Sequence, residues 1–194
     1  MDLDFSKSII LENERVRIEP LILSHYNLLT HIVVDNPDLL RYSPAKFGTL
    51  NLLKEYIENN VLLRGCCKKY PFVIFDKECQ EYAGSTSFLN ISNKDERLEI
   101  GSTWIGEKYQ KTGLNRNCKL LLMTYAFEEL KAVRLEFKTD GRNKQSQKAI
   151  EGIGAKYEGI LRSHTVMPDG YRRDTVYYSV LKDEWNGVKG SFKY

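Results

Sequence analysis

The chain has 194 residues, of which 42% are hydrophobic and 28% are charged, and its formal net charge is +3. This composition is typical of one globular domain with a sizeable core. It argues against the strongly basic surface of a nucleic-acid-binding domain, and no apolar run approaches the roughly 20 residues of a membrane helix.

Other compositional signals concern the compartment and metals. The first seven residues lack the apolar core of a signal peptide, so we expect a cytoplasmic protein. The four cysteines, two of them adjacent at Cys66 and Cys67, show neither zinc spacing nor a C-x-x-C pair. The three histidines offer no metal cluster, and we therefore expect no metal site.

Hydrophobic periodicity and turn signals divide the chain into strands and helices. We predict strands at 15–21, 71–76, 82–91, 97–105 and 133–139, followed by a hairpin that turns at Pro168-Asp169-Gly170. We predict helices at 25–34, 50–63, 114–131 and 143–152, the first capped by Ser24 and ended by Asn36-Pro37. No repeat or linker interrupts this order. We expect a single domain over 1–194, with its core at about 13–185 and a loosely ordered tail at 186–194.

The junction between strand 97–105 and the next helix is the most informative segment. Its turn, Gln110-Lys111-Thr112-Gly113-Leu114-Asn115, contains a glycine, and cations lie in or beside it at Lys108, Lys111, Arg116 and Lys119. A helix N-terminus presents N–H groups and the positive end of a dipole, which suits a pyrophosphate. The spacing fits neither G-x-x-x-x-G-K-[ST] nor G-x-G-x-x-G. An ordinary solvated turn is the alternative.

The pattern Gln110-x-x-Gly113-x-Asn115 resembles the Q/R-x-x-G-x-G/A signature of the GCN5-related N-acetyltransferases (GNAT). Two later segments also match that family: an N-x-x-S helix opening at Asn143 and Ser146, and the helix end at 153–155. The closing segment 164–179 looks like the ribosomal-protein N-terminal acetyltransferase branch (RimJ/RimL-like). The resemblance covers about 13–185.

The resemblance implies an α/β (α+β) GNAT fold, in which about four helices flank a mixed central sheet of about seven strands. It also implies a splayed V between the fourth and fifth strands, 97–105 and 133–139, with the cofactor in the gap. In the family a bulge accompanies this splay, and Gly101 or Gly106 would permit one here.

The same resemblance implies acetyl-CoA as cosubstrate. The backbone of Thr103 and Ile105 would pair with the pantetheine arm, and the N–H groups of 111–115 would hold the pyrophosphate. Lys119 is either a phosphate ligand or a solvated surface lysine. The cofactor-binding candidates are Thr103, Trp104, Ile105, Gln110, Lys111, Thr112, Gly113, Leu114, Asn115, Lys119, Asn143 and Ser146.

Glu99 and Ser146 are the catalytic candidates that the resemblance implies. Glu99 occupies the family's strand glutamate and would act as a base through a water, unless it is a solvent-facing strand residue. Ser146 would protonate the leaving thiolate. The family's usual acid is a tyrosine four residues later, where this chain has Ile150, so the reaction has either Ser146 or no dedicated acid. Plain helix capping by Asn143 and Ser146 is the alternative.

The acceptor side is less defined by the sequence. Tyr42 and Phe47 lie in the loop between the first two helices, which shapes the acceptor pocket in this family. His164 would face Asp174 or Arg173 across the last hairpin, depending on register. That contact would serve acceptor recognition, or it is a structural cross-strand pair, which we favour.

We therefore expect an N-acetyltransferase that moves an acetyl group from acetyl-CoA to a primary amine by direct attack. The favoured acceptor is a protein or peptide N-terminal α-amine. A small-molecule amine is one alternative, and a non-catalytic CoA-binding sensor is another. We expect neither nucleic acid nor membrane as a partner. A homodimer, the identity of the acceptor and the physiological role stay open.

Overall fold

The computed structural model describes residues 1–192 and contains one eight-stranded sheet in the order β1-β2-β3-β4-β5-β6-β8-β7. The strands are β1 Leu11–Glu12, β2 Val16–Pro20, β3 Lys69–Asp76, β4 Glu81–Ser92, β5 Arg97–Ile105, β6 Arg134–Asp140, β7 Lys156–Val166 and β8 Arg172–Leu181. The α-helices are α1 Tyr26–Asp35, α2 Leu50–Gly65, α3 Leu114–Thr124, α4 Lys144–Glu151 and α5 Trp185–Ser191.

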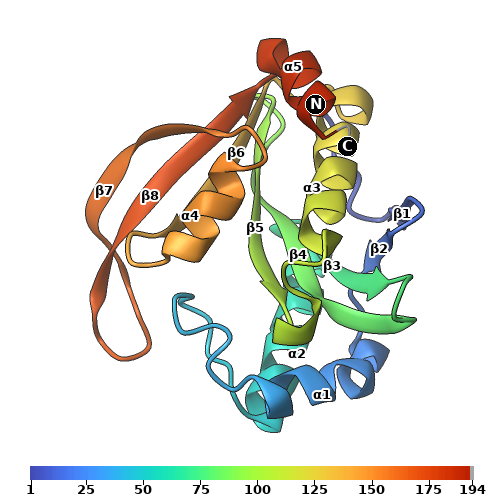
Figure 1. Cartoon of the computed structure of the whole chain (residues 1–194), viewed down its shortest axis with the longest axis vertical. Helices are drawn as coiled ribbons and strands as arrows, with labels where there is room; N and C mark the ends of the chain where they lie inside the picture. The colour runs from blue at the N-terminus through green and yellow to red at the C-terminus, as the bar shows by residue number, and fades with distance from the viewer. Residues whose placement is uncertain (193–194) are drawn as a thin grey trace.

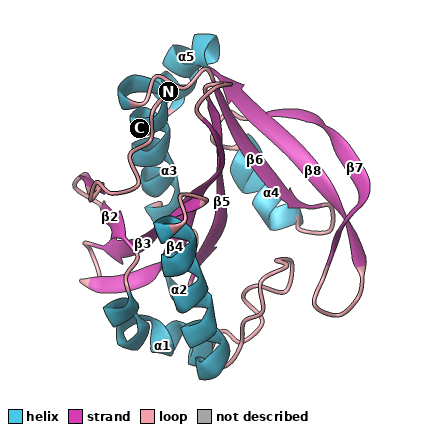
Figure 2. Ribbon diagram, turned by 180° about the vertical axis from the view of Figure 1, so that it is seen from behind, coloured by secondary structure: helices cyan, strands magenta, loops and turns pink. Residues whose placement is uncertain are grey.

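The sheet is divided into two arms that part toward one end (Figure 1). Strands β1 to β5 form one arm, with α1 and α2 on one face and α3 on the other (Figures 1 and 2). Strands β6, β8 and β7 form the second arm, which carries α4. The apolar core lies between the helices and the sheet, and its aromatic part includes Tyr70, Phe72 and Phe88, none of them exposed.

The arms part because β5 and β6 pair over only a short length. Their parallel ladder contains Arg97↔Arg134, Leu98↔Leu135 and Glu99↔Glu136 and goes no further. Beyond Glu99, β5 has no strand partner on that side among residues 1–192. The two strands are the fourth and fifth of the predicted series, so the expected V is confirmed.

The bulge in β5 does not use a glycine. The β4–β5 pairing changes from Ser85↔Trp104 to Ser87↔Gly101. Between these two pairs β5 therefore contains one residue more than β4. Within this stretch Ser102 adopts a left-handed φ of 48°. The expectation that Gly101 or Gly106 provides the irregularity is therefore wrong, since a serine accepts the positive φ and the extra residue itself bends the strand.

Four other expectations need correction. The short β1 brings the sheet to eight strands, and α5 brings the α-helices of residues 1–192 to five. Ser24 lies inside a 3₁₀ turn, Leu23–His25, and caps no helix. The helix expected at 114–131 changes at Tyr125–Glu129 into a π-helix.

The tail is ordered through Phe192, against the expectation of a loose segment. Trp185 stacks on Phe127 with ring centroids 5.2 Å apart, and Phe192 is 5% exposed beneath the Arg116 guanidinium, which is 4.6 Å from its ring centroid. These apolar contacts outweigh the weak helix propensity of its glycines. The last two residues of the predicted tail, 193–194, lie outside the described part.

Lys119 is buried on the apolar face of α3, with 6% of its surface exposed. Its Nζ donates to Thr103 Oγ1 at 2.6 Å and to Thr86 Oγ1 at 3.4 Å, beside the β5 bulge. No carboxylate of residues 1–192 lies within ion-pair distance of it. Burial lowers the pKa of Lys119 to about 8 because the charged form loses its hydration.

This burial predicts a pH-dependent stability. The pKa of Lys119 is near 8 when folded and near 10.5 when unfolded, so between these values the unfolded chain binds more protons. The free energy of unfolding should rise with pH across this window, by at most about 1.4 kcal/mol per pH unit for one proton. Urea unfolding of the wild type and of Lys119→Met at pH 7, 8, 9 and 10 measures the difference.

Lys119 contributes to that rise only if Lys119→Met makes it smaller and the exposed-site control Lys182→Met leaves it unchanged, because Lys69, whose pKa burial also lowers to about 8, adds a rise of its own. If the free energy of unfolding of the wild type differed from that of Lys119→Met by the same amount at every pH, the assignment to Lys119 would be contradicted.

Candidate active site

A cavity of about 830 Å³ occupies the space between the two arms. Its walls come from α2, β5, the turn before α3, β6, α4 and the β7–β8 hairpin. The predicted site residues on its walls are Tyr42, Glu99, Thr103, Trp104, Ile105, Gln110, Lys111, Gly113, Asn115, Lys119, Asn143, Ser146 and His164. Segments far apart in sequence therefore meet in one site.

Four predicted site residues do not line this cavity. Phe47 packs behind the wall, 5.2 Å from the Trp104 ring. The Thr112 hydroxyl points to the underside of the turn, and Leu114 is fully buried in the core. Thr112 and Leu114 can therefore contribute only backbone groups. Asp174 accepts a hydrogen bond from the amide of Ser163 at 2.7 Å.

The turn before α3 lines the cavity through Gln110, Lys111, Gly113 and Asn115. Gly113 is the N-cap residue of α3 and has a left-handed φ of 84°, which favours glycine. Asn115 follows in the first helical turn, and its buried Oδ1 has no hydrogen-bond partner within residues 1–192. The Gln110 side chain donates to Ile105 O at 2.9 Å and accepts from Gln145 of α4 at 2.9 Å. Gln110 thus joins the turn to both arms.

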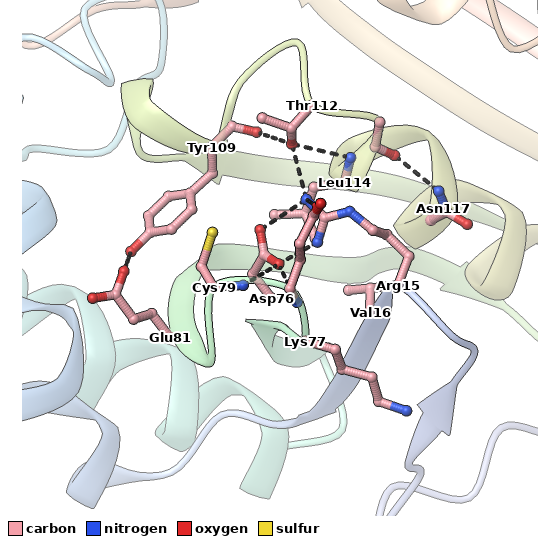
Figure 3. Close-up of polar contacts among 12 residues, drawn as sticks. Arg15, Val16, Asp76, Lys77, Cys79, Glu81, Tyr109, Thr112, Leu114 and Asn117 are labelled. Carbon is pink, nitrogen blue, oxygen red and sulfur yellow. Dashed lines mark hydrogen bonds and ion pairs between the residues drawn. The ribbon is translucent and has the colours of Figure 1, made fainter.

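An ion pair holds the turn from below (Figure 3). Arg15 donates to Asp76 through both terminal guanidinium nitrogens, with Nη2 3.0 Å from Oδ2, and Nη2 also donates to Thr112 Oγ1 at 3.2 Å. Thr112 in turn donates to Tyr109 O at 2.8 Å. Burial raises the pKa of Asp76, but hydrogen bonds from Arg15 and two backbone amides outweigh burial and lower it. The carboxylate therefore stays charged and keeps the turn in place.

The cations around the turn have different environments. Lys108 pairs with Glu81 at 2.7 Å, and Arg116 donates to Gly152 O and Ser191 O, each at 2.7 Å. Lys119 lines the cavity while its ammonium donates to Thr103 and Thr86, so its role as a phosphate ligand stays a prediction. The alternative of a solvated Lys119 is wrong. Lys111 is exposed, lines the cavity and makes no ion pair with any residue in 1–192.

Glu99 is 5% exposed and lies where β5 and β6 part. Its Oε2 accepts from Asn90 Nδ2 at 2.7 Å and pairs with Lys138 Nζ at 2.9 Å. No residue in 1–192 donates to Oε1. The alternative of a solvent-facing glutamate is therefore wrong, and one oxygen of a fixed carboxylate remains able to accept a proton.

The opening of α4 also faces the cavity. Asn143 caps the helix, because its Oδ1 accepts from the Ser146 amide at 3.0 Å, so the capping interpretation is confirmed for Asn143. Ser146 and the buried Ile150 line the wall beside it. Capping and facing the cavity are compatible, since the cap uses only Asn143 Oδ1.

The hairpin does not pair His164 with Asp174 or Arg173. Thr165 pairs with Arg173 and Val166 with Arg172, as expected for a loop whose central residue is Asp169. The register then shifts between Leu161 and Thr165. Ser163 has a φ of 52° at this shift, and His164 Nδ1 lies 3.1 Å from Thr175 Oγ1. A bulge that the sequence pattern does not signal therefore turns the imidazole to a different partner.

Two cationic residues of the cavity, Lys69 and Lys138, were not predicted as site residues, and Arg173 was considered only as a partner of His164. Only Lys138 could have been identified as a site residue from a pattern in the sequence. Arg134, Glu136 and Lys138 alternate along β6 and give it one polar face, which suggests a strand that lines a charged site. Lys69 and Arg173 are ordinary lysine and arginine positions in sequence, and only the fold places them here.

The arrangement combines an anion-binding turn, an open strand edge and a buried carboxylate. The edge of β5 beyond Glu99 can accept an extended polar chain by backbone hydrogen bonds. Residues 1–192 hold no group of three or more His, Cys, Asp or Glu side chains placed to bind a metal ion. No helix in this part of the chain is both long and apolar enough to span a membrane.

Comparison with known proteins agrees with this geometry. Residues 15–156 match the Acetyltransferase (GNAT) domain family. YdaF of Bacillus subtilis (strain 168), named as a candidate ribosomal N-acetyltransferase, is 36% identical over 106 residues, which are 55% of this chain and 57% of YdaF. In that match the chain therefore spans little more than half of the relative's length.

Solved structures resemble the chain over nearly its whole length. A candidate acetyltransferase from T. thermophilus has a TM-score of 0.86 and 34% identity, with 95% of each chain covered. An acetyl transferase from Salmonella typhimurium has a TM-score of 0.78 and 21% identity, with 89% of this chain and 99% of that chain covered, so it shares the fold. The chain belongs to the GNAT acetyltransferase family and is similar to proteins named as ribosomal N-acetyltransferases.

Proposed function

We propose that the protein transfers the acetyl group of acetyl-CoA to a peptide or protein N-terminal α-amine by direct attack. GNAT acetyltransferases use acetyl-CoA. The observation that carries the proposal is that one cavity joins the N-terminal turn of α3 to the buried Glu99 along the open edge of β5. The YdaF name and the Salmonella protein, which is described as modifying an N-terminal serine of a ribosomal subunit protein, favour this class of acceptor.

The turn would bind the pyrophosphate. Its N–H groups at 111–115 and the exposed Lys111 would supply hydrogen bonds and positive charge. The open edge of β5 at Thr103 and Ile105 would pair with the amides of the pantetheine arm. Asn143 and Ser146 would border that arm from the opposite wall.

The chemistry then needs a proton acceptor near Glu99. Glu99 Oε1 would take the amine proton through a water while Oε2 stays held by Lys138 and Asn90. The amine nitrogen attacks the thioester carbonyl, the C–S bond breaks and the thiolate takes up a proton. With Ile150 in place of a tyrosine, the hydroxyl of Ser146 or solvent would supply that proton.

Titration calorimetry with acetyl-CoA, followed by thiol release against a panel of peptides and small amines, tests the proposal. Binding together with release on N-terminal peptides is expected. Release only with small amines would overturn the acceptor class, and binding without release on any amine would favour the sensor alternative.

Replacing Gly113 by glutamate tests the anion site. The new side chain strains a backbone at φ 84° and places a carboxylate beside the pyrophosphate, so affinity for acetyl-CoA should fall by more than about 100-fold. Calorimetry measures the change. Gly187→Glu in α5 is the matched control, because a side chain there meets nothing within 4 Å. Unchanged affinity in Gly113→Glu would remove the turn from the cofactor site.

Replacing Glu99 by glutamine tests the base. The amide keeps the shape of the side chain but cannot take a proton, so kcat at pH 7 should fall by about 10²–10³-fold while acetyl-CoA affinity is retained. Glu136→Gln is the matched control, since Glu136 also pairs with Lys138, at 3.6 Å, but does not line the cavity. Wild-type rates of Glu99→Gln from pH 6 to 9 would exclude Glu99 from proton transfer.

A further inference from the structure

The charges that line the cavity are strongly unbalanced. They are Lys69, Glu99, Lys111, Arg116, Lys119, Lys138 and Arg173, with one carboxylate among them. Lys111 lies in the turn, Arg116 lies in the first turn of α3, and Lys119 donates to Thr103 of β5. Away from the turn, three cations therefore surround one anion, Glu99, and that anion is already paired with Lys138 at 2.9 Å.

Lys69 is a half-buried cation without a counterion among residues 1–192. It begins β3, and its Nζ donates to Ser102 Oγ in the β5 bulge at 3.0 Å. The Tyr56 ring centroid lies 5.8 Å from it. No carboxylate of residues 1–192 lies within ion-pair distance. Burial lowers the pKa of Lys69 to about 8, an effect that Glu99 partly opposes.

Arg173, on the other arm, is also a half-buried cation without an ion-pair partner among residues 1–192. It projects from β8, and its Nη1 donates to Tyr42 O at 3.1 Å and its Nε to Thr175 Oγ1 at 3.2 Å. Burial lowers the pKa of Arg173, although Asp140 and Glu99 oppose that effect. Neither acid is an ion-pair partner for it: Asp140 is bound by Arg142 at 2.7 and 3.0 Å, and Glu99 pairs with Lys138.

These two cations have the electrostatic character of a carboxylate site. A positively charged group of an acceptor would be repelled by Lys69 and Arg173. A carboxylate would instead supply the counterion that both side chains lack. The same positive potential favours the neutral form of an incoming amine, which direct attack requires.

We propose that Lys69 and Arg173 select acceptors that carry a carboxylate beside the reacting amine, in a peptide whose first or second residue is acidic. The inference rests on the proposed function and specifies its substrate. The free α-carboxylate of an amino acid has the same chemistry, so the test includes it as a separate arm.

The test compares kcat/KM at pH 7 for three C-terminally amidated peptides, Ser-Asp-Ala, Ser-Ala-Ala and Ser-Lys-Ala, together with free serine and free aspartate. The wild type should prefer the Asp peptide to the Lys peptide by about tenfold or more. In Lys69→Met and in Arg173→Gln, KM for the Asp peptide should rise about tenfold, while kcat stays within about twofold and KM for the Ala peptide is little changed.

Two further variants distinguish the effect of the positive charge from other effects of a substitution. Arg173→Lys retains the charge and should retain most of the preference, even though it loses the Tyr42 contact. Lys94→Gln, at an exposed turn position, should leave all values unchanged. Equal use of the three peptides by the wild type, or an equal loss on all three in the variants, would overturn the inference and leave the proposed function standing.

Failure of the proposed function gives a different result. Turnover of free aspartate or serine but of no peptide would overturn the peptide acceptor while keeping selection for a carboxylate. Acetyl-CoA binding without turnover of any of these amines would overturn both.

Discussion

The parting of β5 from β6 after Glu99 is the constraint on which the rest of the structure depends. Three residue pairs join β5 to β6, and beyond them each strand presents to the cavity an edge that no strand of residues 1–192 pairs with. In a continuous sheet those edges would bond to each other and leave no room for a ligand. The bulge at Ser102 and the buried ammonium of Lys119, which bonds Thr103 and Thr86, stabilise β5 in its diverging course. The cavity is thus built into the sheet.

The anion-binding turn depends on residues remote from it. Arg15 and Asp76 come from the first arm, and their ion pair meets the turn through Thr112 (Figure 3). Gln110 and Gln145 then link the turn to α4 across the cavity. A turn held on both sides presents its N–H groups in a fixed arrangement, so little conformational entropy is lost when an anion binds.

Which charged side chains face the cavity depends on the packing of the fold as much as on the sequence. Lys108 and Arg116 are taken up by structural contacts, whereas Lys69 and Arg173, distant in sequence, face the cavity without counterions in residues 1–192. The cations beside the motif therefore differ in what they offer a ligand: Lys111 lies in the cavity without an ion pair in residues 1–192, whereas structural contacts occupy Lys108 and Arg116. The energy of a charge depends on its solvation and partners, and both follow from the tertiary structure.

The sequence by itself determined the order of the elements, the strand–turn–helix unit at 97–115 and the opening of α4 at Asn143. Those features are local, because periodicity, glycine at positive φ and an N-cap side chain act within a few residues. Only the tertiary structure decided where the β5 bulge lies, that Lys119 is buried, that His164 meets Thr175 and that residues to Phe192 are ordered. Each of these depends on an element distant in the chain, and one sequence carries no local signal of that packing.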